Sequence, residues 1–345
     1  MRIEEVAPDA WDTLLEGIGC TDVYLRRAYV ESACLLDGGA PALLHLAGAD
    51  GDVVFACSLR PVPGSQGLQD VTTPYGYGGP VAFGQAPPVE AFWELYERWC
   101  AENAVVSTFL RFHPLFGNHR YAGPSVRVEA LAATFSWRLD GHEDLERSMH
   151  RHHRRVVRKA APEVEVEVAE RPPHLSGFTA LYARTMRRRG AAPFYFFPDA
   201  YWDALAAGLR DELVLFNGRV EGELAASVLC LASPPWLHYH LGGTADPARF
   251  RGASTLLMLA AARWGREHGF EQLHLGGGVG GREDSLWEYK RRFAPDGRRE
   301  AAIGKLVHDE RAYLSLAGAD ALELDGFFPA YRASLSASVA PGLGR

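Results

Sequence analysis

The spacing of apolar residues predicts a chain in which strands and helices alternate from end to end. Short apolar or alternating runs bounded by glycine, proline or aspartate are typical of strands, and apolar repeats at three and four residues are typical of helices. The expected strands are residues 42–47, 53–59, 105–112, 126–137 (as one strand or two), 164–168, 212–217, 221–231, 236–241, 270–275 and 303–308. The expected helices are residues 89–103, 147–159, 175–189, 199–209, 254–267 and, more weakly, 313–324.

The two halves of this pattern share one order of elements. Each contains helices, a meander of strands joined by tight turns, such as one expected at Gly218, then a further helix and a strand. This order predicts an α/β (α+β) protein with an internal pseudo-repeat, in which helices flank mixed sheets. The boundary falls between Gly141 and Glu170, and we place it after residue 145.

Residues 273–295 combine three features that suit chemistry on a carbonyl group. A buried strand ends in the glycine run 276–281, and glycine accepts the positive φ of a sharp turn that presents backbone amides. Lys290 follows on a segment in which Leu286, Tyr289 and Phe293 recur at helical spacing. A cation beside such a turn stabilises the negative charge that develops on a carbonyl oxygen during acyl transfer. On this stretch alone, however, a surface helix with solvated charges is the commoner explanation.

The same glycine run fits the dinucleotide-binding pattern GxGxxG, but its context does not. That fingerprint opens the first helix of a βαβ unit and has an acidic residue about twenty positions later. Here the run lies near the end of the chain, and Glu300 lies in a charged turn. No GK[ST] follows, so a P-loop is excluded as well.

Composition narrows the class of protein. Of the 345 residues 47% are hydrophobic, yet no run approaches the roughly 18 apolar residues that span a bilayer. The N-terminal segment is acidic and interrupted by Pro8, which predicts no secretory signal and a cytoplasmic location. The five cysteines are odd in number and never form CxxC, so we expect reduced, buried thiols with neither disulfides nor a zinc site.

The positive charge is clustered, although the net charge is −7. Arg151, Arg154, Arg155 and Arg158 follow the spacing i, i+3, i+4, i+7, which places four guanidinium groups on one helical face. The neighbouring histidines, residues 150, 152 and 153, lack metal-ligand spacing and carboxylate neighbours, so we assign them to this basic face and predict no metal site. A second cluster comprises Arg184, Arg187, Arg188 and Arg189.

The loop before the helix at residues 254–267 has a pattern suited to phosphates. Arg249, Gly252 and Ser254 stand in the register R-x-x-G-x-S, between a strand and a long helix. This resembles the pyrophosphate loop of the GNAT superfamily, [Q/R]-x-x-G-x-[G/A]. The unpaired amides at a helix start favour an anion there.

Three further segments narrow the resemblance. SMHRHHRRVVRKA carries R-x-x-[IV]-R-K-A, LYARTMRRRG before FYFFPDAYW carries Y-x-x-T-x-x-R, and the segment around Lys290 carries [FY]-K-x-x-F. Together they resemble Fem-type aminoacyltransferases, GNAT-superfamily enzymes that move an amino acid from aminoacyl-tRNA to an amine of peptidoglycan precursors. The similarity covers about residues 145–295, and in the first half it rests on TPYGYGGP and RFHPL.

The resemblance implies a fold and a reaction. Two tandem GNAT-like domains are expected, residues 1–145 and residues 146–345, the second carrying the donor and catalytic site. The donor would be aminoacyl-tRNA, and the acceptor the amine of a small molecule or a peptidoglycan-type precursor. No bound cofactor is expected, and the sequence indicates no oligomeric state.

The resemblance also implies roles for particular residues. Arg188 matches the arginine of the Y-x-x-T-x-x-R helix that binds phosphate, and the arginine stripe on residues 151–158 would bind tRNA. Lys290, next to Tyr289 where the family more commonly has phenylalanine, would stabilise the tetrahedral state. His240, on one strand face with His238, is a candidate for the proton route. The residues expected at the acceptor are Tyr75, Tyr77, Arg111 and His113.

Two alternatives remain open. An acyl-CoA could replace the charged tRNA as donor on the same fold, using the loop at residues 249–254. A degenerate tandem domain could instead bind a cell-wall fragment or partner without catalysis. One departure also bears on the acceptor: the family's substrate-binding lysine near the N-terminus has no match, since residues 22–32 offer only Arg26 and Arg27.

Overall fold

A computed structural model describes residues 1–141, 144–246, 248, 250–318, 322 and 324–333. The strands are β1 (Glu4–Glu5), β2 (Ala40–Ala47), β3 (Asp50–Pro61), β4 (Gln69–Thr72), β5 (Val81–Ala86), β6 (Val105–Arg111), β7 (Arg127–Arg138), β8 (Glu165–Glu170), β9 (Leu213–Val220), β10 (Glu223–Ser233), β11 (Trp236–Thr244), β12 (Gln272–Gly276) and β13 (Arg298–Val307). The helices are α1 (Trp11–Gly17), α2 (Arg27–Cys34), α3 (Val89–Glu102), α4 (Leu145–Ser148), α5 (Arg151–Ala160), α6 (Ser176–Arg189), α7 (Asp199–Gly208), α8 (Ala253–Glu267), α9 (Ser285–Arg291) and α10 (Glu310–Ala317).

The expected repeat is present in the structure. The first half runs α1, α2, β2, β3, β4, α3, β6, and the second runs α6, α7, β9, β10, β11, α8, β12. In each half the helix before the last strand lies in the chain between two strands that pair in parallel, β4 with β6 in the first half and β11 with β12 in the second. The strands of each meander pair antiparallel. Mixed sheets flanked by helices are therefore confirmed.

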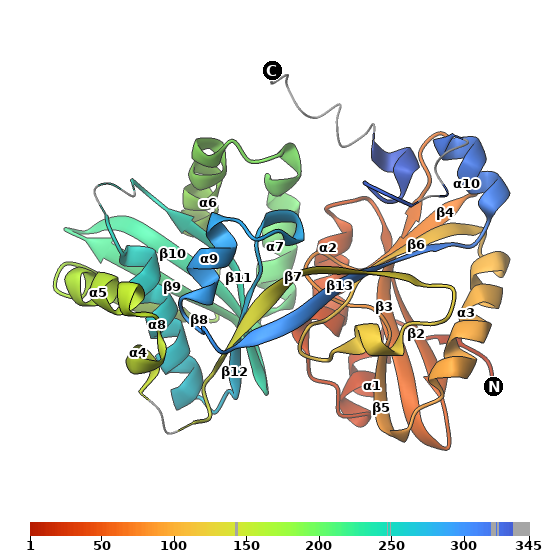
Figure 1. Ribbon diagram of the computed structural model, residues 1–345, viewed down its shortest axis with the longest axis horizontal. Helices are drawn as coiled ribbons and strands as arrows, with labels where there is room; N and C mark the ends of the chain where they lie inside the picture. The colour runs from red at the N-terminus through yellow and green to blue at the C-terminus, as the bar shows by residue number, and fades with distance from the viewer. Residues whose placement is uncertain (142–143, 247, 249, 319–321, 323, 334–345) are drawn as a thin grey trace.

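The two halves exchange the strand that follows each repeat. Strand β7 follows β6 in the chain but pairs with β12 and β13, and β13 follows β12 but pairs with β6 and β7. The result is a single 13-stranded sheet with the order β1-β2-β3-β4-β6-β13-β7-β12-β11-β10-β9-β8, and β5 pairs with β3. In Figure 1, β7 and β13 run between the two lobes. The domain boundary after residue 145 stays a prediction, because each lobe contains a strand from the other side of that position.

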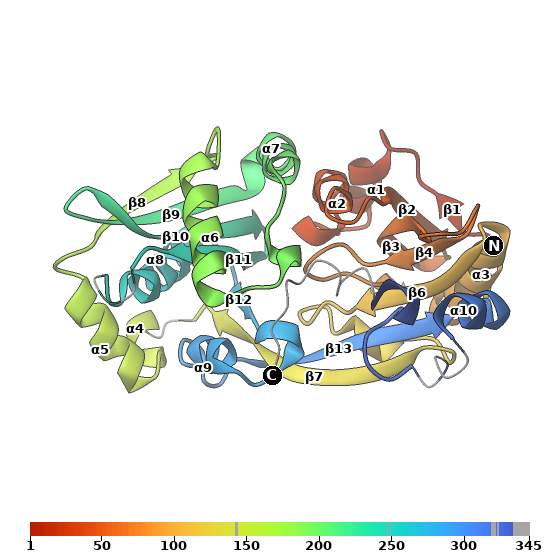
Figure 2. The same cartoon turned by 90° about the horizontal axis from the view of Figure 1, so that it is seen from above.

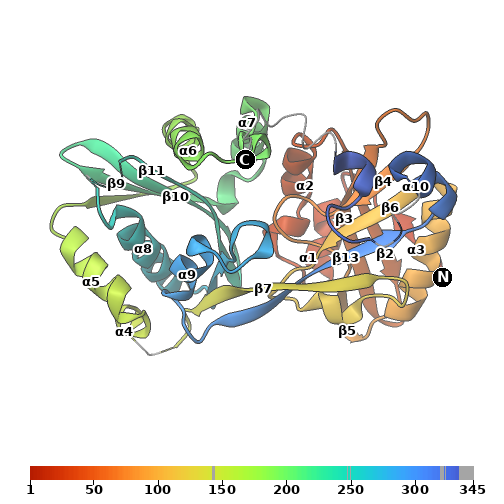
Figure 3. The ribbon, with the colours of Figure 1, turned by 45° about the horizontal axis from the view of Figure 1, so that its top comes forward.

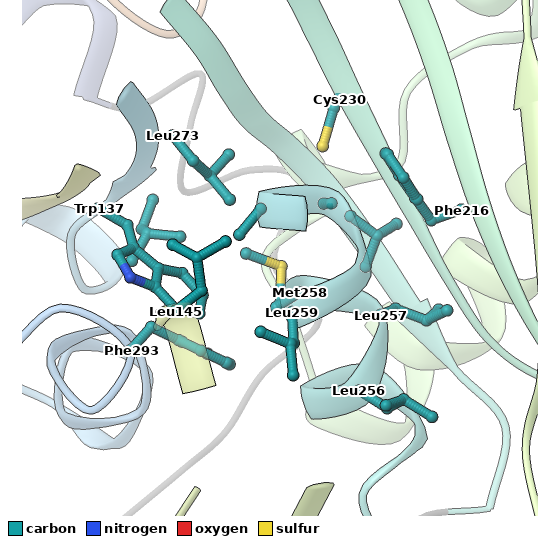
Figure 4. Packing of buried hydrophobic residues seen from close by; sticks show 14 of the residues in the cluster. Trp137, Leu145, Phe216, Cys230, Leu256, Leu257, Met258, Leu259, Leu273 and Phe293 are labelled. Carbon is teal, nitrogen blue, oxygen red and sulfur yellow. The ribbon is translucent and has the colours of Figure 1, made fainter. Parts of the chain in front are cut away.

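In the second lobe, alternate residues of the strands face different helices. In β10, Val228 and Cys230 join a buried cluster with α8, whereas Leu229 and Leu231 join a cluster with α6 and α7. This alternation has the period of two that a strand buried on both faces requires. Figure 3 shows α6 and α7 on one side of this sheet and α8 on the other, and Figure 4 shows the packing around α8.

The buried cluster on the side of α6 and α7 also joins the two lobes. It includes residues of α1 and α2 from the first half and Tyr201, Leu205 and Leu213 from the second. At the contact between α2 and α7, a Cβ on Gly208 would lie 2.8 Å from the Cβ of Ala28, so only glycine allows this approach. Figure 2 shows α7 and α2 side by side, seen from above.

Local sequence explains most element ends, with one exception. Helix α8 is followed by Gly269 at φ 77°, as a helix C-terminus favours. The turn expected at Gly218 is wrong, because Gly218 lies inside β9 and the turn comes at Glu221 and Gly222, both with positive φ. A Cβ on Gly218 would lie 3.1 Å from Val164 Cγ1 and 3.4 Å from Leu257 Cδ2 of α8, so close packing favours a glycine there without a turn.

None of the helices that the structure describes has the length and apolar character that crossing a bilayer requires.

Replacing Leu257 with alanine tests the packing of α8 on the sheet. Leu257 is fully buried, so we expect Leu257→Ala to lower the free energy of unfolding by roughly 2–5 kcal/mol through lost contacts and the remaining cavity. Val168→Ala on β8, where 45% of the side chain is exposed, should change it by less than about 0.5 kcal/mol. Urea denaturation of the two variants measures both, and equal losses would contradict the packing described.

Candidate active site

Strands β11 and β12 part in the middle of the sheet. Their parallel ladder joins Trp236, Leu237 and His238 to Gln272, Leu273 and His274. Beyond these pairs β11 continues to Thr244, while β12 ends at Gly276. Past these three pairs the two strands form no further ladder with each other in the described structure.

The side chain of Lys290 ends where the strands part. Its Nζ donates a hydrogen bond to the carbonyl oxygen of Gly277 at 2.8 Å and lies 5.4 Å from the ring centroid of Tyr239. Only 9% of Lys290 is exposed, so the prediction of a surface helix with solvated charges is wrong for this residue. Burial lowers the pKa of Lys290 to about 8, and Asp284 opposes this change only in part.

Gly276 brings both halves of the chain to this point. Its φ is 73°, and a Cβ there would lie 3.0 Å from Lys290 Nζ and 3.3 Å from the hydroxyl oxygen of Tyr77. Glycine is therefore required both by the backbone conformation and by the lack of space. Tyr77 comes from the first half, so the two halves build the site together.

Tyr289 connects Lys290 to the start of α8. The Tyr289 hydroxyl is 3.4 Å from Ser254 Oγ, in the first turn of that helix. Burial raises the pKa of Tyr289, which keeps its hydroxyl protonated near neutral pH. The helix begins after Gly252 without a side-chain cap, so its N-terminal dipole faces the same region.

Gly252 has a packing role in addition to its place in the phosphate-loop pattern. A Cβ on Gly252 would lie 2.7 Å from Val156 Cγ1 and 3.2 Å from the Cβ of Ala160, both in α5. The basic helix therefore packs directly on the loop before α8.

Arg249, the first residue of the predicted pattern, lies outside the described residues. Arg188 donates to the carbonyl oxygen (2.9 Å) and Oγ1 (2.8 Å) of Thr244, at the entrance to this loop.

The arginine stripe on α5 divides into two pairs. Arg154 donates to the carbonyl oxygens of Arg147 and Met149, and Arg158 forms an ion pair with Glu146. Arg151 and Arg155 are exposed and, with His150, His152 and Arg292, line a surface hollow of about 530 Å³.

The assignment of all three neighbouring histidines to the basic face is wrong for His153. His153 is buried, its Nε2 lies 2.9 Å from the carbonyl oxygen of Tyr289, and burial lowers its pKa to about 4. It is therefore neutral and contacts α9 instead of solvent.

Among the residues expected at the acceptor, Tyr77 lies beside Gly276, whereas Tyr75 and His113 contact His240 and His238 on the face of β11 opposite Tyr239. Tyr77 approaches Gly276, and its ring lies 5.1 Å from that of His274. The carbonyl oxygen of Tyr75 accepts a hydrogen bond from the Tyr29 hydroxyl. The ring of Tyr75 contacts His240 and Phe197. Burial raises the pKa of both tyrosines, and the nearby Arg111 guanidinium partly offsets this increase.

His240 lies on the face of β11 opposite Tyr239 and shares a 2.9 Å hydrogen bond with Tyr201. Burial lowers the pKa of His240 to about 3, so its ring is neutral.

His113 belongs to a buried polar cluster between the halves. Its Nε2 lies 3.4 Å from Asp22 Oδ2, and His238 Nε2 lies 2.9 Å from the same oxygen. The backbone N–H groups of Leu115 and Phe116 donate to His113 Nδ1, at 3.2 and 3.4 Å, which places the ring proton on Nε2. A metal-bound histidine has the opposite arrangement, with a bare nitrogen toward the ion and an N–H toward an acceptor. The donor set of this trio therefore suits a hydrogen-bonded carboxylate better than a metal ion.

Sequence reasoning missed several neighbours of Lys290. Tyr239 and His274 lie near the Lys290 ammonium but are not singled out by the sequence analysis, and neither is Asp22, which contacts His113 and His238. Arg189 was noted only as part of a cluster. Burial raises the pKa of the Tyr239 hydroxyl, and the Arg189 guanidinium is close enough to offset part of this, as it also is at Tyr289. Consecutive residues of a helix point in different directions, so the sequence alone could have indicated that Arg188 and Arg189 differ in orientation.

Comparison with known proteins agrees with this architecture. Residues 146–291 match the family model described as an acetyltransferase (GNAT) domain. A crystal structure of FemX is similar with a TM-score of 0.68 at 13% identity, covering 92% of this chain and 100% of that one. The C-terminal domain of a putative lysylphosphatidylglycerol synthetase from Agrobacterium fabrum gives 0.55 at 12% identity, covering 96% and 97% of the two chains. A tandem GNAT protein from the clavulanic acid biosynthesis pathway gives 0.51 at 9% identity, covering 89% and 98%. No curated protein sequence matches.

Residues 146–291 thus match a GNAT domain. The chain as a whole shares its fold with FemX and with the tandem GNAT protein.

Replacing Lys290 with methionine tests whether the buried ammonium is a structural group. Folding desolvates this charge, so Lys290→Met should raise the free energy of unfolding at pH 7, on the order of 1–2 kcal/mol after loss of the bond to Gly277. The pKa of wild-type Lys290 is lower folded than unfolded, so wild-type stability rises between pH 8 and pH 10.5 and the advantage of methionine shrinks there.

Lys305→Met is the matched control. Lys305 is 2% exposed, but its amine bonds Glu129 at 2.9 Å and the Leu324 carbonyl oxygen at 2.7 Å, so removal should destabilise the protein. Denaturation at pH 7 and 9.5 measures both variants. A large loss of stability in Lys290→Met would assign Lys290 a structural role.

Proposed function

We propose that this protein transfers an aminoacyl group from aminoacyl-tRNA to the amine of a small-molecule or peptidoglycan-type acceptor, in the cytoplasm. The observation that carries the proposal is the buried ammonium of Lys290 at the parting of β11 and β12. A buried charge without a carboxylate in contact is costly, and it is useful where negative charge develops.

In the proposed reaction the ester carbonyl of the donor lies between the parted strands. The neutral acceptor amine attacks the carbonyl carbon, a C–N bond forms, and the oxyanion of the tetrahedral state lies beside Lys290. The C–O bond to the tRNA ribose then breaks. The ribose oxygen leaves with the proton that the amine gives up, and the ammonium of Lys290 is unchanged. Holding both substrates in one place supplies much of the acceleration.

Tyr289, Tyr77 and Arg111 would position the substrates around Lys290. Tyr289 reaches the first turn of α8, where the 3′-terminal phosphates of the donor would meet the helix N-terminus. Tyr77 and Arg111 approach from the first half, on the side from which the acceptor would enter. His240 is neutral and lies on the other face of β11, so a role in moving the proton would need water between it and the amine.

Two names among the similar structures bear on the donor. One is a putative lysylphosphatidylglycerol synthetase, whose name joins an amino acid to an acceptor, and the other is the tandem GNAT protein, which is described as being without AcCoA. The exposed arginines beside α8 favour a polyanionic carrier, and the acyl-CoA-dependent N-acyltransferase is the alternative that the next experiment separates.

The donor is tested by direct comparison. Purified protein is incubated with a panel of amines and either mixed labelled aminoacyl-tRNAs or labelled acetyl-CoA, and products are identified by mass spectrometry. We expect amide products from aminoacyl-tRNA, with kcat lowered on the order of 10²–10³-fold in Lys290→Met. Consumption of acetyl-CoA instead would support the alternative donor. Turnover that is unaffected by Lys290→Met would refute the role of the ammonium.

The exposed arginines of α5 should set the salt dependence of tRNA binding. Arg151→Glu with Arg155→Glu should weaken binding of tRNA and reduce the slope of log Kd against log salt by about 2, one unit for each lost phosphate contact. The control is Arg2→Glu with Arg98→Glu, which changes the net charge equally at exposed positions of the first lobe. Filter-binding titrations from 50 to 300 mM salt measure the slopes. An equal change in both double variants would mean that only net charge matters.

A further inference from the structure

An exposed aromatic turn lies between α6 and α7. It is the short helix Pro193–Tyr195 and the residues that follow, and 54% of Phe194 and 40% of Phe196 are exposed. The turn is rigid, because the backbone N–H groups of Tyr195 and Phe196 donate to the carbonyl oxygens of Ala192 and Pro193, both at 2.9 Å. Two phenyl rings exposed on one turn, directly after a basic helix end, offer an aromatic surface to a ligand.

One of the exposed rings, that of Phe194, contacts a buried aromatic cluster. Phe197 is 8% exposed and packs on Tyr75, Tyr182 and Tyr201 at ring distances of 5.1, 5.8 and 5.0 Å. Phe194 lies 5.9 Å from Tyr75 and 6.2 Å from Phe197. The outer ring is thus fixed in place, and stacking on it would cost little conformational entropy.

The turn is close to both the positive charge and the site. Arg187, Arg188 and Arg189 form the last turn of α6 immediately before it, and the charge of Arg189 partly offsets the raised pKa of Tyr239 and Tyr289. The loop that contacts Phe194 through Tyr75 also carries Tyr77, which lies beside Gly276. Arginines at a helix C-terminus are favourable by themselves, so the exposed rings beside them are the observation that points to a ligand.

We propose that Phe194 and Phe196, with the arginines of the last turn of α6, stack the unpaired bases at the 3′ end of the donor RNA. This inference rests on the proposed function and names how the carrier is held near its reactive ester. Aromatic faces beside cations bind single-stranded nucleic acid with little sequence preference, since every base has a π-face. Residues 184–199 contain four arginines and one acidic residue, Asp199, which is the charge that a phosphate backbone favours.

The test separates stacking from charge. The probe is a fluorescein-labelled RNA hairpin ending in single-stranded ACCA, compared with the same hairpin whose four 3′ positions are abasic and keep their phosphates. We expect Phe194→Ala and Phe196→Ala each to weaken binding of the first hairpin about tenfold and to leave binding of the abasic hairpin unchanged. Phe327→Ala, which removes a ring that is 55% exposed in the first lobe, should change neither.

Each outcome decides between the possibilities. If the phenylalanine variants bind the ACCA hairpin as wild type does, or lose affinity for both hairpins equally, the stacking inference is wrong. Failure of the wild-type protein to prefer ACCA over the abasic end would also overturn it. Binding is measured without transfer, so a stacking signature in a protein that transfers no aminoacyl group would refute the proposed function and keep this inference. Transfer of an aminoacyl group without a stacking signature would support the proposed function and refute this inference.

Discussion

The exchange of β7 and β13 between the halves is the constraint on which the rest of the structure depends. Neither half completes its own sheet, since β12 pairs with β7 and β6 pairs with β13. Backbone hydrogen bonds therefore cross the junction and fix the two lobes relative to each other. This fixed arrangement lets Tyr77 from one half and Lys290 from the other approach the same glycine. A site assembled from two independently mobile domains would not hold side chains so closely without a large interface.

Lys290 differs from Lys305, the other buried lysine among the described residues, in the partners of its ammonium. The structure gives Lys290 one carbonyl oxygen and an aromatic face, whereas Lys305 bonds a carboxylate and carbonyl oxygens. Asp284, the acidic residue that acts on Lys290, uses its own oxygens to cap α9 at Trp287 and to bond the Val279 amide. Among the described residues, the ammonium therefore has no carboxylate in contact, and a positive charge that no carboxylate neutralises is what an oxyanion site requires.

Local patterns predicted the elements well and their mutual contacts poorly. The repeat of helices, meander, helix and strand was readable, because each element carries its own period and turn residues. The turn at Gly218 was predicted wrongly because a glycine that allows Val164 and Leu257 to pack closely looks the same in sequence as one that turns the chain. The burial of Lys290 could not be read either, since it depends on Gly276, Tyr77 and Tyr239, which come from three separate elements. The same holds for His153, which faces Tyr289 more than a hundred residues away.

The short helix α9 links the groups that the proposed reaction needs. Tyr289 and Lys290 are adjacent, yet one reaches Ser254 at the start of α8 and the other reaches Gly277 beyond the end of β12. The other side of α9 is tied to the basic helix, because His150 donates its backbone N–H to the Arg292 carbonyl oxygen at 2.8 Å and His153 contacts Tyr289. A carrier bound along α5 would therefore act on the helix that holds the ammonium. Since these contacts share one short element, changes at α5, α8 and Lys290 would not be independent, and their effects on transfer would be less than additive.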